Sequence, residues 1–226
     1  MINHHLQVSL DIVLFTLKDE RLLVFLQKRT SDPFVNKWSL PSCETLQPGN
    51  ITIEEAILGK LNALPIDELS YLEQVKSIGN ATRDPRGWSL AVVYYGFIIS
   101  DKADTKNMNK HMAWFTIEDI NANDLAFDHA QIIQDSYQRL QNKALYTSLP
   151  AFLLPQDFTL TELQKAYESV LGFTIEKKSF RRRMLDAGLL IETEKVRHAN
   201  HRPAKVYQLL HKEPHIFSRI IEGMRS

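Results

Sequence analysis

The 226-residue sequence has little of what marks secreted or membrane-spanning proteins. It contains a single cysteine, Cys43, which excludes a disulfide within the chain and a thiolate-rich zinc site. Its longest strongly apolar run, Leu90 to Ile99, is far shorter than the roughly 20 residues of a membrane span. The first residues lack the basic and then apolar layout of a signal peptide. We therefore expect a cytoplasmic protein with no membrane partner.

Net charge is also absent, because 27 Lys and Arg residues balance 27 Asp and Glu residues. Division of the chain at Pro150 shows an asymmetry: residues 151–226 hold 13 basic and 9 acidic residues, against 14 and 18 in residues 1–150. The excess is concentrated between Lys177 and Lys205, where nine basic residues face three acidic ones. Such a block is expected of a nucleic-acid-binding module, although plain solvated surfaces also carry such blocks.

The first 150 residues contain apolar, β-branched runs that predict strands. These runs lie at residues 8–17, 21–29, 88–99 and 111–120. Apolar residues spaced by three or four predict an amphipathic helix over residues 51–64, with Glu54 and Glu55 in its first turn. A second helix is expected over residues 128–145, with Asp128 as its N-cap. This order indicates an α/β fold of the α+β type, a mixed sheet with helices packed on it.

The last third of the chain has the pattern of a compact helical domain. One helix is bounded by the capping-box pair Thr159 and Glu162 at its start and by Gly172 at its end. Residues 191–210 then form two short extended runs joined by a polar, basic turn. This arrangement resembles the hairpin wing of a winged helix.

Between these elements lies the basic segment "KKSFRRRMLDAGLL", which predicts a helix that ends near Gly188. Phe180 and Met184 are expected on its buried side, which leaves Arg181, Arg182 and, more obliquely, Arg183 able to reach outwards. In a recognition helix, phosphate contacts supply affinity, and an arginine that reads guanine supplies specificity. The alternative is a basic solvated face on a small protein-binding domain.

Several segments resemble one known family. "KRTSDPFVNKWSLP" resembles the approach to the catalytic loop of Nudix proteins, and "GNATRDPRGWSLAVVYY" resembles a strand pair of ADP-ribose-type Nudix domains. With "SFRRRMLDAGLL" and "RPAKVY", nearly the whole chain resembles the NrtR family, Nudix-related transcriptional regulators of NAD metabolism. The resemblance implies a Nudix-like domain over residues 1–148 and a winged helix-turn-helix domain over residues 149–226.

The segment "LPSCETLQPGNITIEEAILGKL" departs from the Nudix catalytic pattern G-x5-E-x7-R-E-U-x-E-E-x-G-U, in which U is a bulky aliphatic residue. Working hydrolases bind Mg²⁺ through carboxylates on one helix face, because a hard cation prefers oxygen ligands. We align the register on "LP" and on the apolar helix face, and allow two extra loop residues. The motif glycine and the glutamate and arginine positions then fall on Cys43, Ile51, Gly59, Lys60, Ala63 and Leu64. We therefore expect no catalytic residue, no metal site and no enzyme activity.

The resemblance instead implies that ADP-ribose, or a related nucleotide, is an effector, with no cofactor required. Arg83 and Arg86 can fork onto phosphate oxygens, or can belong to a surface turn set by the neighbouring proline and glycine. Trp38 and Phe127 can stack on adenine or lie in the core. His129 matches the family, but is equally explained as a polar neighbour of a helix cap. The candidate effector residues are Arg29, Trp38, Arg83, Arg86, Phe127 and His129.

The implied function is repression of NAD biosynthesis or salvage genes, with DNA binding modulated by the effector. A homodimer on a palindromic operator is expected, because one recognition helix covers few base pairs. The wing departs from the family at His201, where glycine is usual before "RPA". The candidate DNA contacts are Lys178, Ser179, Arg181, Arg182, Arg183, Arg197, Arg202 and Lys205.

Two alternatives come from other classes of function. One is a Nudix nucleoside-diphosphate hydrolase with displaced ligands, for which Glu44, Glu54 and Glu55 are the candidate carboxylates. The other is a Nudix winged-helix regulator that responds to a sugar. Hydrolysis of ADP-ribose would identify the first, and binding of simple pentoses in place of ADP-ribose would identify the second.

Overall fold

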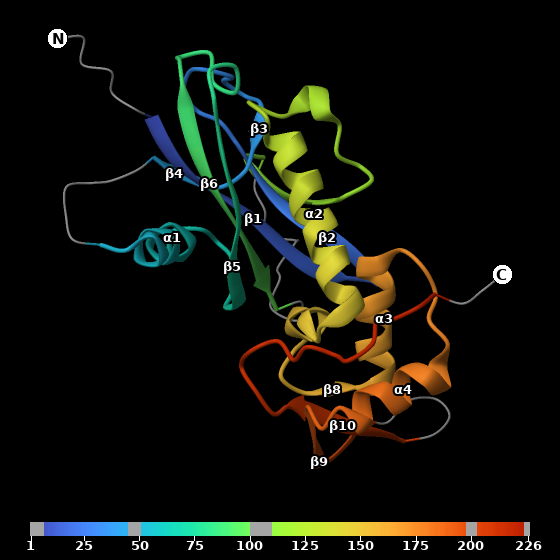
Figure 1. Ribbon diagram of the computed structural model, residues 1–226. Coiled ribbons are helices and arrows are strands. Elements are labelled where there is room, and N and C mark those ends of the chain that lie inside the picture. Colours follow the sequence, from blue (N-terminus) through green and yellow to red (C-terminus); the bar gives the residue numbers. More distant parts are fainter. Residues whose placement is uncertain (1–6, 45–50, 100–109, 198–202, 224–226) are drawn as a thin grey trace. The chain divides into compact units, whose positions relative to one another are not determined.

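The computed structural model describes residues 7–44, 51–99, 110–197 and 203–223 (Figure 1). The chain divides into two compact units. Unit 1 holds most of the chain up to Tyr137, and unit 2 holds the chain from Gln138 onward together with the turn Leu17–Leu22. The division falls within the long helix α2 (His129–Tyr146).

Unit 1 is built on a mixed sheet whose main path has the order β3-β2-β1-β6-β5, while β4 pairs with β1 and β7 pairs with β2. The strands in the described residues are β1 (Gln7–Lys18), β2 (Arg21–Lys28), β3 (Trp38–Ser39), β4 (Ser42–Glu44), β5 (Leu69–Asn80), β6 (Ser89–Ile98) and β7 (Met112–Thr116). β1 runs parallel to β6, and β5 runs antiparallel to β6. β1 and β6 are buried along most of their length, as strands are when both faces of a sheet are covered.

The two faces of β1 have different partners because successive side chains point to opposite sides of a strand. Leu10, Ile12 and Leu14 belong to a core cluster with Ile57 and Leu61 of helix α1 (Ile53–Asn62). Figure 1 shows α1 and α2 on opposite sides of the sheet. The intervening residues of β1, which include an aspartate, therefore face away from α1.

The expected helices of unit 1 are confirmed. α1 begins after Thr52, whose side chain accepts from the backbone N–H of Glu55, while the Glu55 carboxylate accepts from the backbone N–H of Thr52 at 2.6 Å. α2 begins directly after Asp128, as an N-cap residue requires, but the Asp128 carboxylate binds Arg83. A short 3-10 helix, η1 (Ala122–Asp124), precedes α2.

One long strand, β5, was not among the predicted strands. It spans twelve residues, "LSYLEQVKSIGN", and lies at the end of the strand order, where it pairs only with β6 among the described strands. Its side chains are half-buried or exposed, so an edge strand of this kind carries no continuous apolar run.

Unit 2 has the expected winged helix-turn-helix. Its elements are η2 (Leu149–Leu153), β8 (Phe158–Thr159), α3 (Leu160–Leu171), α4 (Lys177–Asp186), β9 (Leu190–Arg197) and β10 (Ala204–Leu209). Thr159 and Glu162 form the predicted capping box, and α3 ends at Gly172 in the left-handed conformation, with φ of 77°. Phe180 and Met184 of α4 are buried, as predicted.

β9 and β10 pair antiparallel as the arms of the wing, and β8 adds to β10. The wing turn, with His201 and Arg202, lies outside the described residues. Among the helices that the structure describes, none combines the length and apolar character that crossing a membrane requires.

Candidate functional site

Unit 1 contains a cavity of about 240 Å³ at the N-terminal end of α2. Strands β1 and β4, the loop between β5 and β6, and the residues around the start of α2 contribute its walls. Five of the six predicted effector residues line it: Arg29, Arg83, Arg86, Phe127 and His129. The structure therefore brings together residues from positions 29 to 129 of the sequence.

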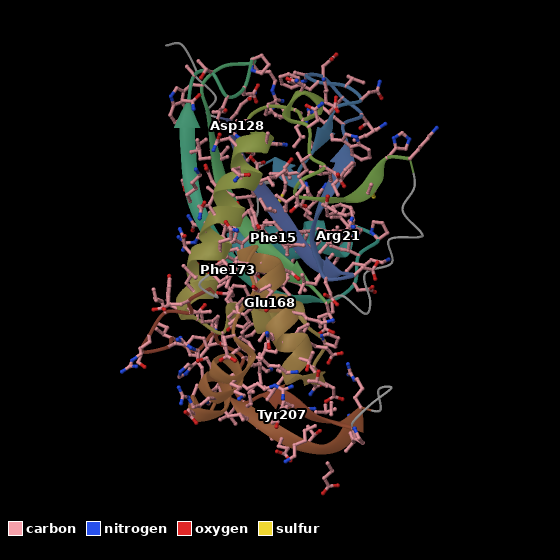
Figure 2. All side chains as sticks on the ribbon, turned by 90° about the vertical axis from the view of Figure 1, so that its right-hand side faces the viewer. Phe15, Arg21, Asp128, Glu168, Phe173 and Tyr207 are labelled. Atoms are coloured by element: carbon pink, nitrogen blue, oxygen red, sulfur yellow. The ribbon has the colours of Figure 1, made fainter. Side chains whose placement is uncertain are left out.

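Arg83 is the centre of a buried ion network in this cavity. Its Nε and Nη2 donate to the two carboxylate oxygens of Asp128, at 3.1 and 2.9 Å. Nη2 also donates to Oδ2 of Asp11 at 3.1 Å, and Nη1 donates to the Ser89 hydroxyl at 3.3 Å. The Arg83 side chain is only 5% exposed. Its guanidinium thus joins Asp11 of β1 to Asp128, the residue before α2. Figure 2 labels Asp128 at this end of α2.

Burial changes the acidity of Asp11, which stands in the middle of β1 and is 2% exposed. Desolvation raises the pKa of Asp11 to about 6; the Arg83 guanidinium opposes this rise, and the Asp128 carboxylate adds to it. Asp11 therefore changes charge closer to neutral pH than an ordinary aspartate does.

His129, the first residue of α2, is also 2% exposed. Desolvation lowers the pKa of His129 to about 3; Asp128 raises it, while Arg83 and Arg29 lower it further. The imidazole is therefore neutral near pH 7. Its Nδ1 accepts from the backbone N–H of Leu40 at 3.0 Å, so its proton lies on Nε2, which is 3.9 Å from Oδ2 of Asp11.

The Phe127 ring lies close to two guanidinium groups. The guanidinium carbon of Arg29 lies 4.7 Å from the ring centroid, and that of Arg86 lies 6.0 Å from it. The Phe34 ring packs edge-on to Phe127 at 4.9 Å. Phe127 has φ of 51°, an uncommon backbone conformation for an aromatic residue that is found preferentially at functional sites.

Both arginines are anchored in their loops. Arg29 donates from Nε to the carbonyl of Pro33 at 2.6 Å. Arg86 donates from Nη2 to Asp84 at 2.8 Å and remains 37% exposed at its side chain. Guanidinium groups beside an aromatic face suit a ligand that carries phosphate oxygens next to an aromatic base.

Trp38, the sixth predicted effector residue, lies on β3. Its ring packs edge-on to Phe115 at 4.9 Å, and the Lys28 ammonium lies 5.0 Å from its centroid. Within the described part of the chain, Trp38 lies outside the cavity lining. Its role in stacking stays a prediction.

Sequence reasoning missed Asp11, together with the cavity hydroxyls of Ser9, Ser42 and Ser89. A signal for Asp11 was present, because it is the one acid in the apolar run "VSLDIVLFTL". Alternation along the strand places it on the face opposite Leu10 and Ile12. Its partner Arg83 lies 72 residues away, and no local pattern connects the two.

The candidate carboxylates of the hydrolase alternative have other partners here. Glu54 accepts from the Tyr94 hydroxyl at 3.2 Å, and Glu55 completes the capping box of α1. The side chain of Glu44 lies outside the described residues. In the part of the chain that is described, no three His, Cys, Asp or Glu residues group so that they could hold a metal ion.

Helix α4 of unit 2, the predicted recognition helix, presents Lys178, Ser179 and Arg182 to solvent. Arg181 is half-buried and donates to the Thr161 hydroxyl at 3.2 Å. Arg183, which was expected to reach outwards only obliquely, is also half-buried. It lies three residues after buried Phe180, on the same side of the helix, and donates to backbone carbonyls of the C-terminal residues.

The described wing residues are exposed cations with acidic neighbours. Arg197 pairs with Glu162 of α3, and Lys205 pairs with Glu192 of β9 at 2.7 Å. Exposed ion pairs contribute little to stability, so such cations can exchange a carboxylate for a phosphate at small cost.

Fold and site together define a class of protein: a Nudix-like domain with a guanidinium-lined cavity, followed by a winged helix with a basic recognition helix. A family model described as the NrtR DNA-binding winged helix domain matches residues 150–209. The ADPR responsive transcriptional repressor NtrR of Acinetobacter baylyi is 40% identical over 96% of this chain and 88% of its own length. The chain belongs to the NrtR family.

Solved structures agree with this assignment. Shewanella oneidensis NrtR complexed with a 27mer DNA has a TM-score of 0.86 and 37% identity, and the match covers 95% of this chain and 99% of that one. The NUDIX domain of the same Shewanella protein complexed with ADP ribose has a TM-score of 0.50 and 32% identity, over 60% and 88% of the two chains. The predicted fold class, a Nudix-like domain followed by a winged helix, is confirmed.

Proposed function

We propose that this protein is a transcriptional repressor whose winged helix binds an operator and whose Nudix-like domain binds ADP-ribose as an effector. The observation that carries the proposal is the cavity at the start of α2, which gathers five predicted effector residues in a chain 40% identical to an ADPR responsive repressor. The family resemblance points to genes of NAD biosynthesis or salvage as targets. We also propose that the protein acts in the cytoplasm, where such genes would be repressed.

In the proposed effector site, Arg29 and Arg86 contact the diphosphate, and Phe127 contacts a ring of the ligand. Their arrangement supports these roles, because both guanidinium groups lie beside the Phe127 ring. Arg83 holds Asp11 and Asp128 together and so shapes the cavity floor. The neutral His129 holds the backbone of Leu40 in place.

We also propose that the site binds its ligand without hydrolysing it. The Nudix glutamate positions fall on Ile51, Lys60, Ala63 and Leu64. The nearby Glu54 accepts a hydrogen bond from Tyr94, and Glu55 forms the capping box at the start of α1. Incubation with ADP-ribose and Mg²⁺ or Mn²⁺ should release no AMP. Turnover that Glu54→Gln or Glu55→Gln abolishes would replace this proposal with the hydrolase alternative.

For DNA binding, we propose a homodimer on a palindromic operator, with residues 1–148 as the sensing domain and 149–226 as the DNA-binding domain. The start of the matched winged-helix model at residue 150 supports this division. The exposed Lys178, Ser179 and Arg182 of α4 would enter the major groove. Arg197, Arg202 and Lys205 would contact the backbone from the wing.

The decisive experiment is a mobility-shift titration of DNA upstream of its own gene and of candidate NAD-metabolism promoters, at one fixed salt concentration. We expect a specific complex that ADP-ribose weakens and that ribose leaves unchanged. Weakening by ribose but not by ADP-ribose would support the sugar-responsive alternative. Absence of any specific complex on these promoters, with folded protein, would contradict the repressor function.

A further inference from the structure

The C-terminal segment, defined here as residues 211–223, forms no helix and no named strand but is attached within unit 2 (Figure 1). Phe217 and Ile221 anchor it, because both side chains are more than 90% buried. Its backbone is also hydrogen-bonded to the end of α2 and to the residues that follow. These bonds join His215 to Ser148, Phe217 to Tyr146 and Ile221 to Leu145, at 2.7 to 2.9 Å.

The same segment is joined to the recognition helix through Arg183. Two nitrogens of its guanidinium donate to the successive backbone carbonyls of Arg219 and Ile220, the latter at 2.5 Å. The guanidinium carbon also lies 5.6 Å from the centroid of the Phe217 ring. Arg183 therefore makes a forked hydrogen bond and a cation–π contact to one short stretch of chain.

We propose that Arg183 is a positioning residue for DNA recognition: it fixes the rotation and depth of α4 against the C-terminal segment and does not itself contact DNA. This inference rests on the proposed DNA binding. A fork onto two successive carbonyls restrains orientation as well as distance, because both donors belong to one rigid plane. The outer face of α4, with Lys178, Ser179 and Arg182, is then presented at a defined angle.

Positioning and phosphate contact have different consequences. Base readout depends on hydrogen-bond geometry at the base edges, whereas non-specific binding depends mainly on the number of neutralised phosphates. Loss of a positioning residue should therefore reduce affinity for operator and leave affinity for random duplex DNA and the salt dependence unchanged. Loss of a phosphate contact should weaken binding to both DNAs and reduce the salt slope by about one.

Lysine and alanine substitutions of Arg183 separate these two roles. Lysine keeps the positive charge but lacks the planar fork that binds two carbonyls. We expect Arg183→Lys and Arg183→Ala each to weaken operator binding by about tenfold or more, the effect of losing hydrogen bonds from a charged donor. Arg182→Ala is the matched control from the exposed face, and should weaken binding to both DNAs.

The measurements are operator and random-duplex affinities of the full chain at several salt concentrations. Thermal unfolding followed by circular dichroism tests whether each variant is folded. Parent-like operator binding by Arg183→Lys would overturn the inference. So would a salt slope reduced by about one in Arg183→Ala. If the parent protein itself binds no operator, the proposed function is wrong. If the parent binds operator and Arg183→Lys binds it equally well, only the positioning role of Arg183 is wrong.

A truncation tests the partner of Arg183 directly. A chain that ends at Ser218 loses the accepting carbonyls of Arg219 and Ile220 but keeps Phe217. The truncation also removes the anchor Ile221, so we expect this chain to lose at least as much operator affinity as Arg183→Ala. The combined variant should lose no more than the truncation alone, because the truncation already removes the interaction of Arg183. Losses that add up in the combined variant would mean that Arg183 acts independently of the segment, and the inference would be wrong.

Discussion

At the scale of single residues, Asp11 and His129 are linked to pH in opposite directions. The pKa of Asp11 is raised from 3.8 to about 6, so its contribution to stability is complete below pH 3.8 and is lost as pH rises through 6. The pKa of His129 is lowered from 6.5 to about 3, so its contribution is complete above pH 6.5 and is lost as pH falls towards 3. Between about pH 4 and 6 the two effects offset each other.

Replacement of Asp11 should remove its part of the pH dependence of stability and leave the part that comes from His129. Asp11→Asn removes a buried charge and keeps an acceptor for Arg83, so we expect it to increase the stability of unit 1 at pH 7.5 by about 1 to 3 kcal/mol, with no gain near pH 4. Urea unfolding followed by tryptophan fluorescence reports this unit, because Trp38, Trp88 and Trp114 all lie in it. A variant less stable than the parent at pH 7.5 would mean that the ion pair with Arg83 outweighs burial.

Arg86 gives the second prediction at this scale. Its side chain is 37% exposed beside the Phe127 ring and can turn from Asp84 to an anionic ligand. Arg86→Ala should weaken ADP-ribose binding by about tenfold or more and leave operator binding without ligand unchanged. Calorimetry and mobility shifts measure the two effects. Trp38→Phe, outside the cavity lining, is the control, and an equal loss there would place the adenine on Trp38.

At the scale of elements, we expect substitution of glycine by alanine to have opposite effects on stability at two positions. Gly172 ends α3 with φ of 77°, whereas Gly59 lies inside α1, and an added Cβ would meet no atom within 4 Å at either position. Gly172→Ala should therefore destabilise by about 1 kcal/mol through backbone strain, and Gly59→Ala should stabilise by about 0.5 to 1 kcal/mol. Thermal unfolding measures both, and equal signs would contradict the conformational explanation.

These elements also show how far local sequence can predict structure. The helix with Thr159, Glu162 and Gly172 was predictable at both ends, because capping is decided by residues three or four apart. The edge strand β5 was not, because exposure on an edge removes the apolar pattern. The partners of Arg183 were not predictable either, since Arg219 and Ile220 lie more than 30 residues away and form no element of their own.

Only some residues of the candidate site could likewise be predicted from the sequence. Arg29, Arg86 and Phe127 came from a resemblance to known sequences, and the structure brings them to one cavity. The ion pair between Asp11 and Arg83 was not predictable in this way. It forms because β1 pairs with β6, a parallel contact between segments roughly 80 residues apart in the chain. Local patterns predict helices and caps, but the ionic floor of this cavity required the three-dimensional fold.

At the scale of the whole molecule, effector and operator must influence each other equally. If ADP-ribose lowers the affinity for operator by some factor, linkage requires that operator lower the affinity for ADP-ribose by the same factor. Factors of about 5 to 150 are typical of such coupling. We therefore expect calorimetric titration of the operator complex to give weaker ADP-ribose binding than titration of the free protein, with the factor found in the mobility-shift experiment.

Variants can separate the coupling from the two binding events. Arg86→Ala should weaken ADP-ribose binding equally with and without operator, because Arg86 contacts ligand in both states, so the coupling factor stays at the parent value. Arg182→Ala should weaken operator binding and likewise leave the factor unchanged. If operator leaves the affinity for ADP-ribose unaltered, ADP-ribose cannot release this repressor from DNA by binding at the cavity. A ligand with equal affinity for the free and the DNA-bound protein does not change the equilibrium between them.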